Sequence, residues 1–259
     1  MNMDCLKQDH LKQGGQKGVS SYLMMFLMAF LSAVALPVEA GDVALEVSTK
    51  GQFVAPQTYQ VDLTTRVASV VNAWRLKPEA YRLGIAMLRE SEKREQSRMR
   101  WALEYQLKTM PIDPELKASL TEQVGRLVAT GRVLKQFNWD LVEVKPKQNR
   151  LLKEGDTFIA PYRPTTVQIS GAVKNHTMPF VGGKTVRQYV HQVIRLAGAD
   201  PSVVWVITPD ANIRQIGVSY WNAQKAYLAP GSVIYVPLQD QQAFNRAMVT
   251  LYAAQVLPY

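Results

Sequence analysis

Arg132 is the residue best suited to bind a ligand, because it directly follows Gly131 where a predicted helix gives way to a predicted strand. A guanidinium at such a junction can hold a carboxylate or phosphate through two parallel hydrogen bonds. An equally weighted alternative is a structural contact, with a carboxylate or with the carbonyls that end a helix. Arg132 is therefore a candidate ligand-binding residue with a structural role as its competitor.

Aromatic side chains are the second group of candidates, because sugar rings stack on exposed Trp and Tyr faces. Trp101 and Tyr105 belong to a predicted helix, and Tyr220 and Trp221 belong to the SYWN segment near the end of a predicted strand. Trp205 lies inside the apolar run VVWVI, which predicts core packing for it instead. The four predicted to be exposed are candidate sugar platforms, with core or interface packing as the alternative.

Catalytic and metal-binding patterns are missing from the sequence. His176 and His191 are the histidines after residue 40, in a polar turn and on the polar part of a helix, and Cys5 is the one cysteine. The sequence lacks HExxH, CxxC, GxSxG and P-loop patterns. We therefore predict no catalytic residue, no metal site and no cofactor, although two carboxylates far apart in the chain could still meet in the fold.

The composition is that of a globular protein with a basic surface. The chain has 259 residues, 47% of them hydrophobic, which allows one large domain or two small ones. Its 30 Lys and Arg against 21 Asp and Glu give a net charge of +9. Such a charge favours nucleic acid, anionic lipid or acidic polysaccharide, and a basic surface without such a partner is the alternative.

Residues 1–40 have the pattern of a secretory signal peptide. Basic residues precede an apolar run over residues 19–36, and Val38-Glu39-Ala40 ends in the small residue that signal peptidase requires. Cleavage is expected before Gly41, and a retained membrane anchor is the alternative. The remaining chain is thus predicted to be periplasmic, with no nucleic-acid partner.

Residues 163–238 predict a sheet that wraps one helix. A hairpin is expected first, then a helix that begins with the capping pair Thr185 and Gln188 and ends at Gly198. Three further strands follow, the last opened by the Pro230-Gly231 turn. The order ββαβββ is that of a β-grasp arrangement.

Short segments of this region resemble a known family. The GAV turn, GADPSVVWVITPD, SYWN and LAPGSVIYV are similar to the second β-grasp unit of the GfcC-like capsule and exopolysaccharide biosynthesis family. They resemble more loosely the SLBB units, soluble ligand-binding β-grasp domains, of outer-membrane polysaccharide export proteins. Thr130-Gly131-Arg132 also matches a TGR segment of the GfcC-like family.

Residues 41–162 predict a second copy of the same arrangement, interrupted by helices. A hairpin over 42–63 and a short helix over 65–74 are expected, then a helical insertion over 78–130 and strands at 133–137 and 141–144. The closing segments Leu152–Pro161 and Leu228–Pro237 share a turn glycine and a terminal proline at one constant offset, which indicates duplication.

The predicted fold is therefore α+β, with β-grasp domains at 41–162 and 163–238 and a C-terminal amphipathic helix within 239–259. The helix carries its apolar residues at i, i+4, i+7 and i+8 and is expected to pack on the body; contact with a partner or a membrane is the alternative. These apolar residues are Phe244, Met248, Leu251 and Tyr252.

The resemblance implies a non-enzymatic periplasmic accessory protein for capsule or exopolysaccharide biosynthesis or export. Its expected partners are extracellular or capsular polysaccharide or the export proteins. A protein-interaction scaffold without glycan binding, and a glycan-modifying enzyme with a cleft near Arg132, are the alternatives. Membrane contact is expected only through the C-terminal helix or an uncleaved signal.

Overall fold

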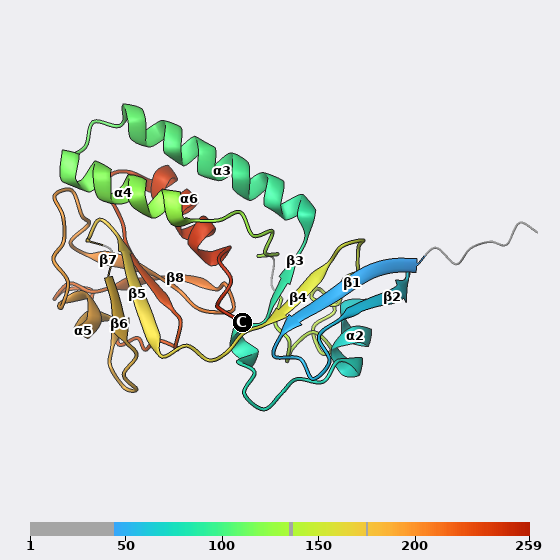
Figure 1. Ribbon diagram of the computed structural model, residues 1–259. Coiled ribbons are helices and arrows are strands. Elements are labelled where there is room, and N and C mark those ends of the chain that lie inside the picture. Colours follow the sequence, from blue (N-terminus) through green and yellow to red (C-terminus); the bar gives the residue numbers. More distant parts are fainter. Residues whose placement is uncertain (1–43, 135–136, 175) are drawn as a thin grey trace, which may run out of the picture. The chain divides into compact units, whose positions relative to one another are not determined.

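The fold is α+β, as predicted, and is built on two mixed sheets in a computed structural model (Figure 1). The structure describes residues 44–134, 137–174 and 176–259. The expected signal peptide lies outside these residues. These described residues belong to one compact unit.

The first sheet has the strand order β2-β1-β4-β3. β1 pairs antiparallel with β2 and parallel with β4, which in turn pairs antiparallel with β3. Apolar and polar residues alternate along β1, so one face of the strand is buried. The elements of this half are β1 (Ala44–Gly51), β2 (Thr58–Asp62), α2 (Val67–Ala73), η1 (Arg82–Gly84), β3 (Ala86–Leu88) and β4 (Thr157–Ala160).

The second sheet has the order β6-β5-β9-β7-β8 and repeats this arrangement. Its opening strand again pairs antiparallel with the next strand and parallel with the last one. The predicted capping box of Thr185 and Gln188 starts its helix. The elements are β5 (Thr166–Gly171), β6 (His176–Pro179), α5 (Val186–Val190), β7 (Val203–Ile207), β8 (Ile213–Gly217) and β9 (Val233–Val236).

A helical hairpin lies between β3 and β4 in sequence but packs with the second sheet. α3 (Glu90–Thr109) and α4 (Pro114–Arg126) run antiparallel to each other (Figure 1). Asp113 caps the N-terminus of α4, where its side chain accepts hydrogen bonds from the backbone N–H groups of Glu115 at 2.9 Å and Leu116 at 3.2 Å. The buried leucines of the hairpin share one core with the second sheet; they are Leu103, Leu107, Leu116 and Leu120.

The C-terminal helix α6 (Gln242–Ala253) packs on the body, as predicted. Its apolar residues Phe244, Met248 and Leu251 are buried in the same core. The Tyr252 hydroxyl donates to Gln123 Oε1 of α4 at 3.0 Å, so α6 is also bound to the hairpin by a polar contact. Among the described helices, none has both the length and the apolarity to cross a bilayer.

The predicted insertion over 78–130 is wrong in its first part. Residues 82–88 form the short η1 turn and strand β3, and the helices begin only at Glu90. β3 pairs with β4, placing Met87 opposite Phe158 in the first core. A strand of three residues is too short to show an alternating pattern in the sequence. Its pairing with a distant strand defines it instead.

The strands predicted at 133–137 and 141–144 are also wrong where the structure describes them. Residues 139–144 form turns, and Lys145 donates its backbone N–H to the carbonyl of Leu141 at 2.9 Å. Phe137, Trp139 and Val142 are buried in the first core, where both rings meet Phe158 edge-on. Their spacing imitates an alternating strand, but burial of aromatic rings decides their conformation.

The predicted helix from Thr185 to Gly198 is shorter than expected and ends at Val190. The chain then returns to β5, where the N–H of Leu196 donates to the carbonyl of Ala172 at 2.9 Å. Ile194, which lies within the predicted helix, is 77% exposed. Tertiary pairing has therefore replaced the last turns of the helix.

Buried Tyr252 gives the fold a testable dependence on alkaline pH. Burial raises its pKa from 10.0 to about 12, so the folded state keeps the phenol protonated where the unfolded state releases its proton. This contribution to stability is complete below pH 10 and is lost as the pH rises from 10 to 12. We expect the free energy of unfolding to fall by roughly 2–3 kcal/mol more in the wild type than in Tyr252→Phe over that interval.

Urea titrations at pH 8, 10, 11 and 12 measure this difference. The Tyr252→Phe variant keeps the ring in the core and removes only the titrating group, so it cancels the other groups that titrate in this range. Equal losses of stability in both proteins would contradict the expectation.

Candidate functional site

Arg132 is buried and its guanidinium donates to backbone carbonyls. Its side chain donates from Nη1 to the carbonyl of Gln255 at 2.8 Å and of Ala253 at 3.3 Å, and from Nη2 to the carbonyl of Pro209. Two of these carbonyls lie at the C-terminal end of α6. The contacts are thus those of the structural alternative, in which a cation binds the carbonyls that end a helix.

Burial lowers the pKa of Arg132 to about 10, and the negative charge of Asp210 partly opposes this effect. Asp210 also acts on Tyr81, whose pKa is raised chiefly by burial. Asp210, next to the Pro209 carbonyl that Arg132 binds, is therefore the acidic group whose charge acts on the buried guanidinium. This relation brings the turn between β7 and β8 into the site.

The β7–β8 turn is held in a defined conformation. Asp210 Oδ1 accepts from the Thr208 hydroxyl and, at 3.4 Å, from the N–H of Asn212. Ala211 has a φ of 62°, in the left-handed region that residues with a Cβ rarely occupy. Because Arg132 binds the adjacent Pro209 carbonyl, it positions the turn that carries Asp210 and Asn212.

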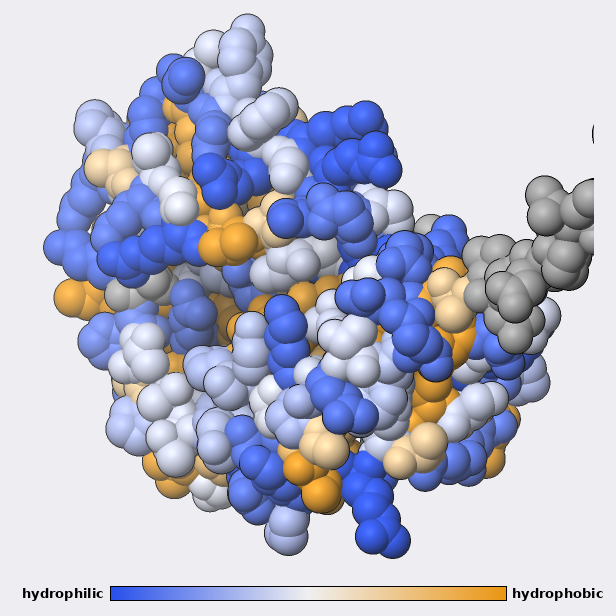
Figure 2. All heavy atoms as spheres, turned by 45° about the vertical axis from the view of Figure 1, so that its right-hand side comes forward, coloured by the Kyte–Doolittle hydropathy of each residue, from blue (hydrophilic) through white to orange (hydrophobic). Residues whose placement is uncertain are grey.

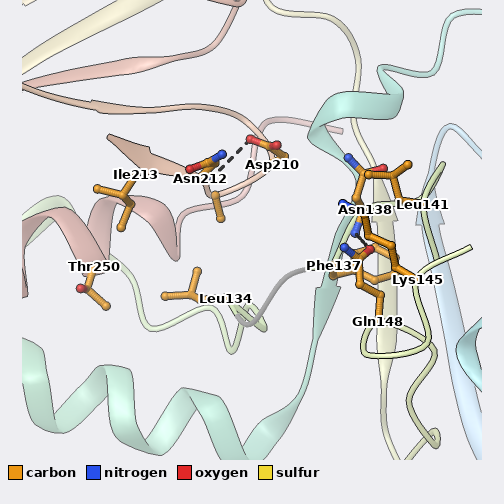
Figure 3. A pocket seen from close by; sticks show the side chains of 11 residues that line it. Leu134, Phe137, Asn138, Leu141, Lys145, Gln148, Asp210, Asn212, Ile213 and Thr250 are labelled. Carbon is orange, nitrogen blue, oxygen red and sulfur yellow. Dashed lines mark hydrogen bonds between the residues drawn. The ribbon is translucent and has the colours of Figure 1, made fainter. Parts of the chain in front are cut away.

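A cavity of about 600 Å³ lies beside this turn, and we call it the β7–β8 groove. In Figure 3, Asp210 and Asn212 lie on one side of it, opposite Asn138, Leu141 and Lys145. Apolar residues including Leu134 and Ile213 complete the wall. The polar side chains that line the groove are Asn138, Lys145, Gln148, Asp210, Asn212 and Thr250.

These side chains suit a ligand rich in hydroxyl groups. Amides and a carboxylate can donate to or accept from neighbouring hydroxyls, while the apolar wall meets the C–H faces of a ring. Gln148 is fixed in place, since it is buried and its Oε1 accepts from the N–H of Asn138 at 3.1 Å. Lys145 is exposed and supplies a positive charge across the groove from Asp210.

Metal binding and catalysis by a pair of carboxylates are the two other kinds of chemistry to consider here. Within the described residues, no cluster of three or more His, Cys, Asp or Glu side chains is placed to hold a metal ion. A smaller cavity of about 280 Å³ adjoins Arg132, and no Asp or Glu is among the described side chains that line it. Among the described residues, no pair of carboxylates therefore lines this smaller cavity.

The four aromatic candidates are exposed, but they lie outside the groove. Trp101 and Tyr105 on α3 are 67% and 69% exposed, and Tyr220 and Trp221 after β8 are 90% and 74% exposed. None of the four lines the groove among its described residues. Trp205, predicted to pack in the core, is half-buried and packs against the core of the second sheet.

The residues that line the groove are not recognisable as a site in the sequence. Pro209 to Asn212 have the composition of a turn, but a single Asp and Asn in a turn carry no sign of a ligand. Asn138, Lys145 and Gln148 lie in or beside the segment mistaken for strands. Only the fold brings these two stretches together.

Two comparisons with known proteins bear on this site. Residues 174–257 match the family model described as "Capsule biosynthesis GfcC C-terminal". The uncharacterized protein YjbG of Escherichia coli (strain K12) is 34% identical over 123 residues, which are 47% of this chain and 50% of YjbG. The chain thus spans about half the length of this relative, and the resemblance to the GfcC-like family is confirmed. The region matched by the family model includes Asp210 and Asn212 but not Arg132.

Replacing Arg132 by Met tests its role in positioning the turn. The variant fills similar volume but leaves buried carbonyl acceptors without donors, so we expect the free energy of unfolding to fall by about 3 kcal/mol. Arg98→Met is the control, because Arg98 is exposed and pairs only with Glu95 on the same helix in the described structure. Urea unfolding measures both; unchanged stability of Arg132→Met would contradict the structural role.

Proposed function

We propose, from the similarity of residues 174–257 to the GfcC capsule biosynthesis family, that this protein is a non-enzymatic accessory protein of capsule or exopolysaccharide production or export. The family match is the observation that carries the proposal. The proposed activity is binding of the glycan in the β7–β8 groove.

The proposal includes an assignment of both sheets as β-grasp units of the SLBB-like kind. In each half, the opening strand and the closing strand are parallel neighbours, and a short helix follows the opening hairpin. The first sheet has the same strand order as the second with one strand fewer at its edge in the described chain. This repetition supports the duplication that the closing segments suggest.

The groove residues and the charge support a glycan as the ligand. Asp210, Asn212 and Asn138 provide hydrogen-bonding groups for hydroxyls, and Lys145 provides a partner for a sugar carboxylate. A net charge of +9 would draw an acidic polymer toward the protein. The signal-peptide pattern of residues 1–40 supports an encounter in the periplasm.

The surface also fits a polar ligand. Hydrophilic residues cover most of the face drawn in Figure 2, and hydrophobic residues appear in small areas between them. Large permanent protein interfaces are more hydrophobic than such a surface.

A scaffold that docks onto the export proteins is the second candidate. The exposed pairs Trp101 with Tyr105 and Tyr220 with Trp221 favour it, since Trp and Tyr are enriched among residues that dominate protein interfaces. These pairs lie outside the groove, so the two functions can be separated by mutation.

Titration calorimetry with protein purified from the periplasm and the producing cell's own extracellular polysaccharide tests the proposal. We expect binding that weakens at high salt, because the electrostatic attraction is screened. Lys145→Gln should weaken it by about tenfold, as expected for one hydrogen bond from a charged donor.

Lys147→Gln is the matched control, because Lys147 is an exposed neighbour that does not line the groove in the described structure. Both variants lose one positive charge, so a difference between them reports the groove itself. If both variants weakened the affinity for the polysaccharide equally, the effect would come from overall charge and not from the groove. Absence of binding at every salt concentration, together with capture of the export proteins, would favour the scaffold.

A further inference from the structure

A second cavity of about 530 Å³ lies where the N-terminal half of α6 meets β7 and β8. We call it the Trp205 pocket. The side chains that matter for its chemistry are Asp200, Trp205, Gln215, Gln239, Gln242 and Arg246. In the described part of the chain, it shares no lining residue with the β7–β8 groove.

The sheet places the Trp205 side chain beside α6. Trp205 pairs with Gln215 on β8 and with Tyr235 on β9, so these three side chains share one face of the sheet. α6 covers Tyr235, whose hydroxyl donates to Asn245 Oδ1 at 3.0 Å. Trp205, one strand further out, is half-buried and lines the cavity.

Buried and backbone hydrogen bonds fix the walls of the pocket. Asn245 of α6 accepts from the N–H of Leu238 at 2.9 Å and donates to its carbonyl at 2.7 Å. Asp200 Oδ1 accepts from the N–H groups of Ser202 at 2.7 Å and Val203 at 3.1 Å. The cavity is therefore preformed, as small-molecule sites usually are.

The chemistry of the lining matches a sugar ring. An indole can stack against the C–H face of a pyranose, as aromatic side chains do against apolar surfaces. The planar amides of Gln215, Gln239 and Gln242 and the guanidinium of Arg246 are then available at the rim for ring hydroxyls. These four side chains are all exposed, so a ligand can reach them.

The charge of the pocket selects among sugars. Asp200 and Asp240 line it together with the single cation Arg246 among its described residues. This excess of carboxylates contrasts with the basic chain as a whole and disfavours a further carboxylate from a ligand. A neutral sugar or an amino sugar fits this environment.

We propose that the Trp205 pocket binds one neutral or amino-sugar residue, as a saccharide site separate from the β7–β8 groove. The inference rests on the proposed glycan-binding function for its biological ligand. A polymer with alternating acidic and neutral residues would then contact the groove through one kind of residue and the pocket through the other.

Saturation-transfer NMR on the protein purified from the periplasm tests the site with methyl glucoside, glucosamine and methyl glucuronide as probes. We expect transfer from the protein to the ring protons of the first two and at least threefold less to the glucuronide. Gln215→Ala and Arg246→Ala, at exposed positions, should each reduce transfer several-fold without loss of fold. Trp205→Ala should abolish it, and Arg98→Ala, which removes an exposed guanidinium outside the pocket, should leave it unchanged.

The outcomes separate this inference from the proposed function. Transfer that survives Gln215→Ala and Arg246→Ala, or that disappears in Lys145→Gln instead, would overturn the pocket while leaving the groove. An absence of transfer to any probe would also overturn it. Transfer that depends on Arg246 in a protein that fails to bind the polysaccharide would support the pocket and count against the proposed function.

Discussion

A buried guanidinium joins segments that are far apart in sequence. Arg132 follows the helical hairpin, and its acceptors belong to the β7–β8 turn and to the end of α6. Removing a cation from water is costly unless its donors are satisfied, and carbonyls at a helix C-terminus satisfy them with a favourable dipole as well. The positions of the hairpin, α6 and the turn therefore depend on one another through this side chain, and the groove depends on the turn.

Two buried glutamines bind the hairpin to the rest of the chain in the same way. Gln96 of α3 accepts from the N–H of Gly131 and donates to the Arg132 carbonyl, while Gln123 of α4 makes the equivalent pair of bonds with Gly171. Both glycines have a positive φ, and a Cβ on either would lie within 2.7 Å of a carbonyl oxygen. Each glutamine amide thus hydrogen-bonds to a backbone segment whose conformation requires glycine. These bonds fix the register of α3 and α4 against the rest of the chain.

The local features of this fold were predictable and the tertiary ones were not. The capping box at Thr185 and the two closing strands follow from short-range chemistry, so the sequence predicts them correctly. β3, the turns around Trp139 and the early end of α5 depend on partners far along the chain. The same holds for the site. The sequence indicates Arg132 as a candidate, but its acceptors are backbone carbonyls, which any residue type can supply. Asp210 and Lys145 form a site only because the fold brings them to the same groove.

The packing of the α3–α4 hairpin against strands that follow it constrains the order of folding. A chain that emerges N-terminus first presents Leu103, Leu107, Leu116 and Leu120 long before β5, β9 and α6 exist to cover them. β1 likewise waits for β4, its parallel neighbour. The first sheet is complete once β4 is present, but the apolar side of the helix pair stays uncovered until nearly all of the chain is released, and such exposed apolar surface is prone to aggregate.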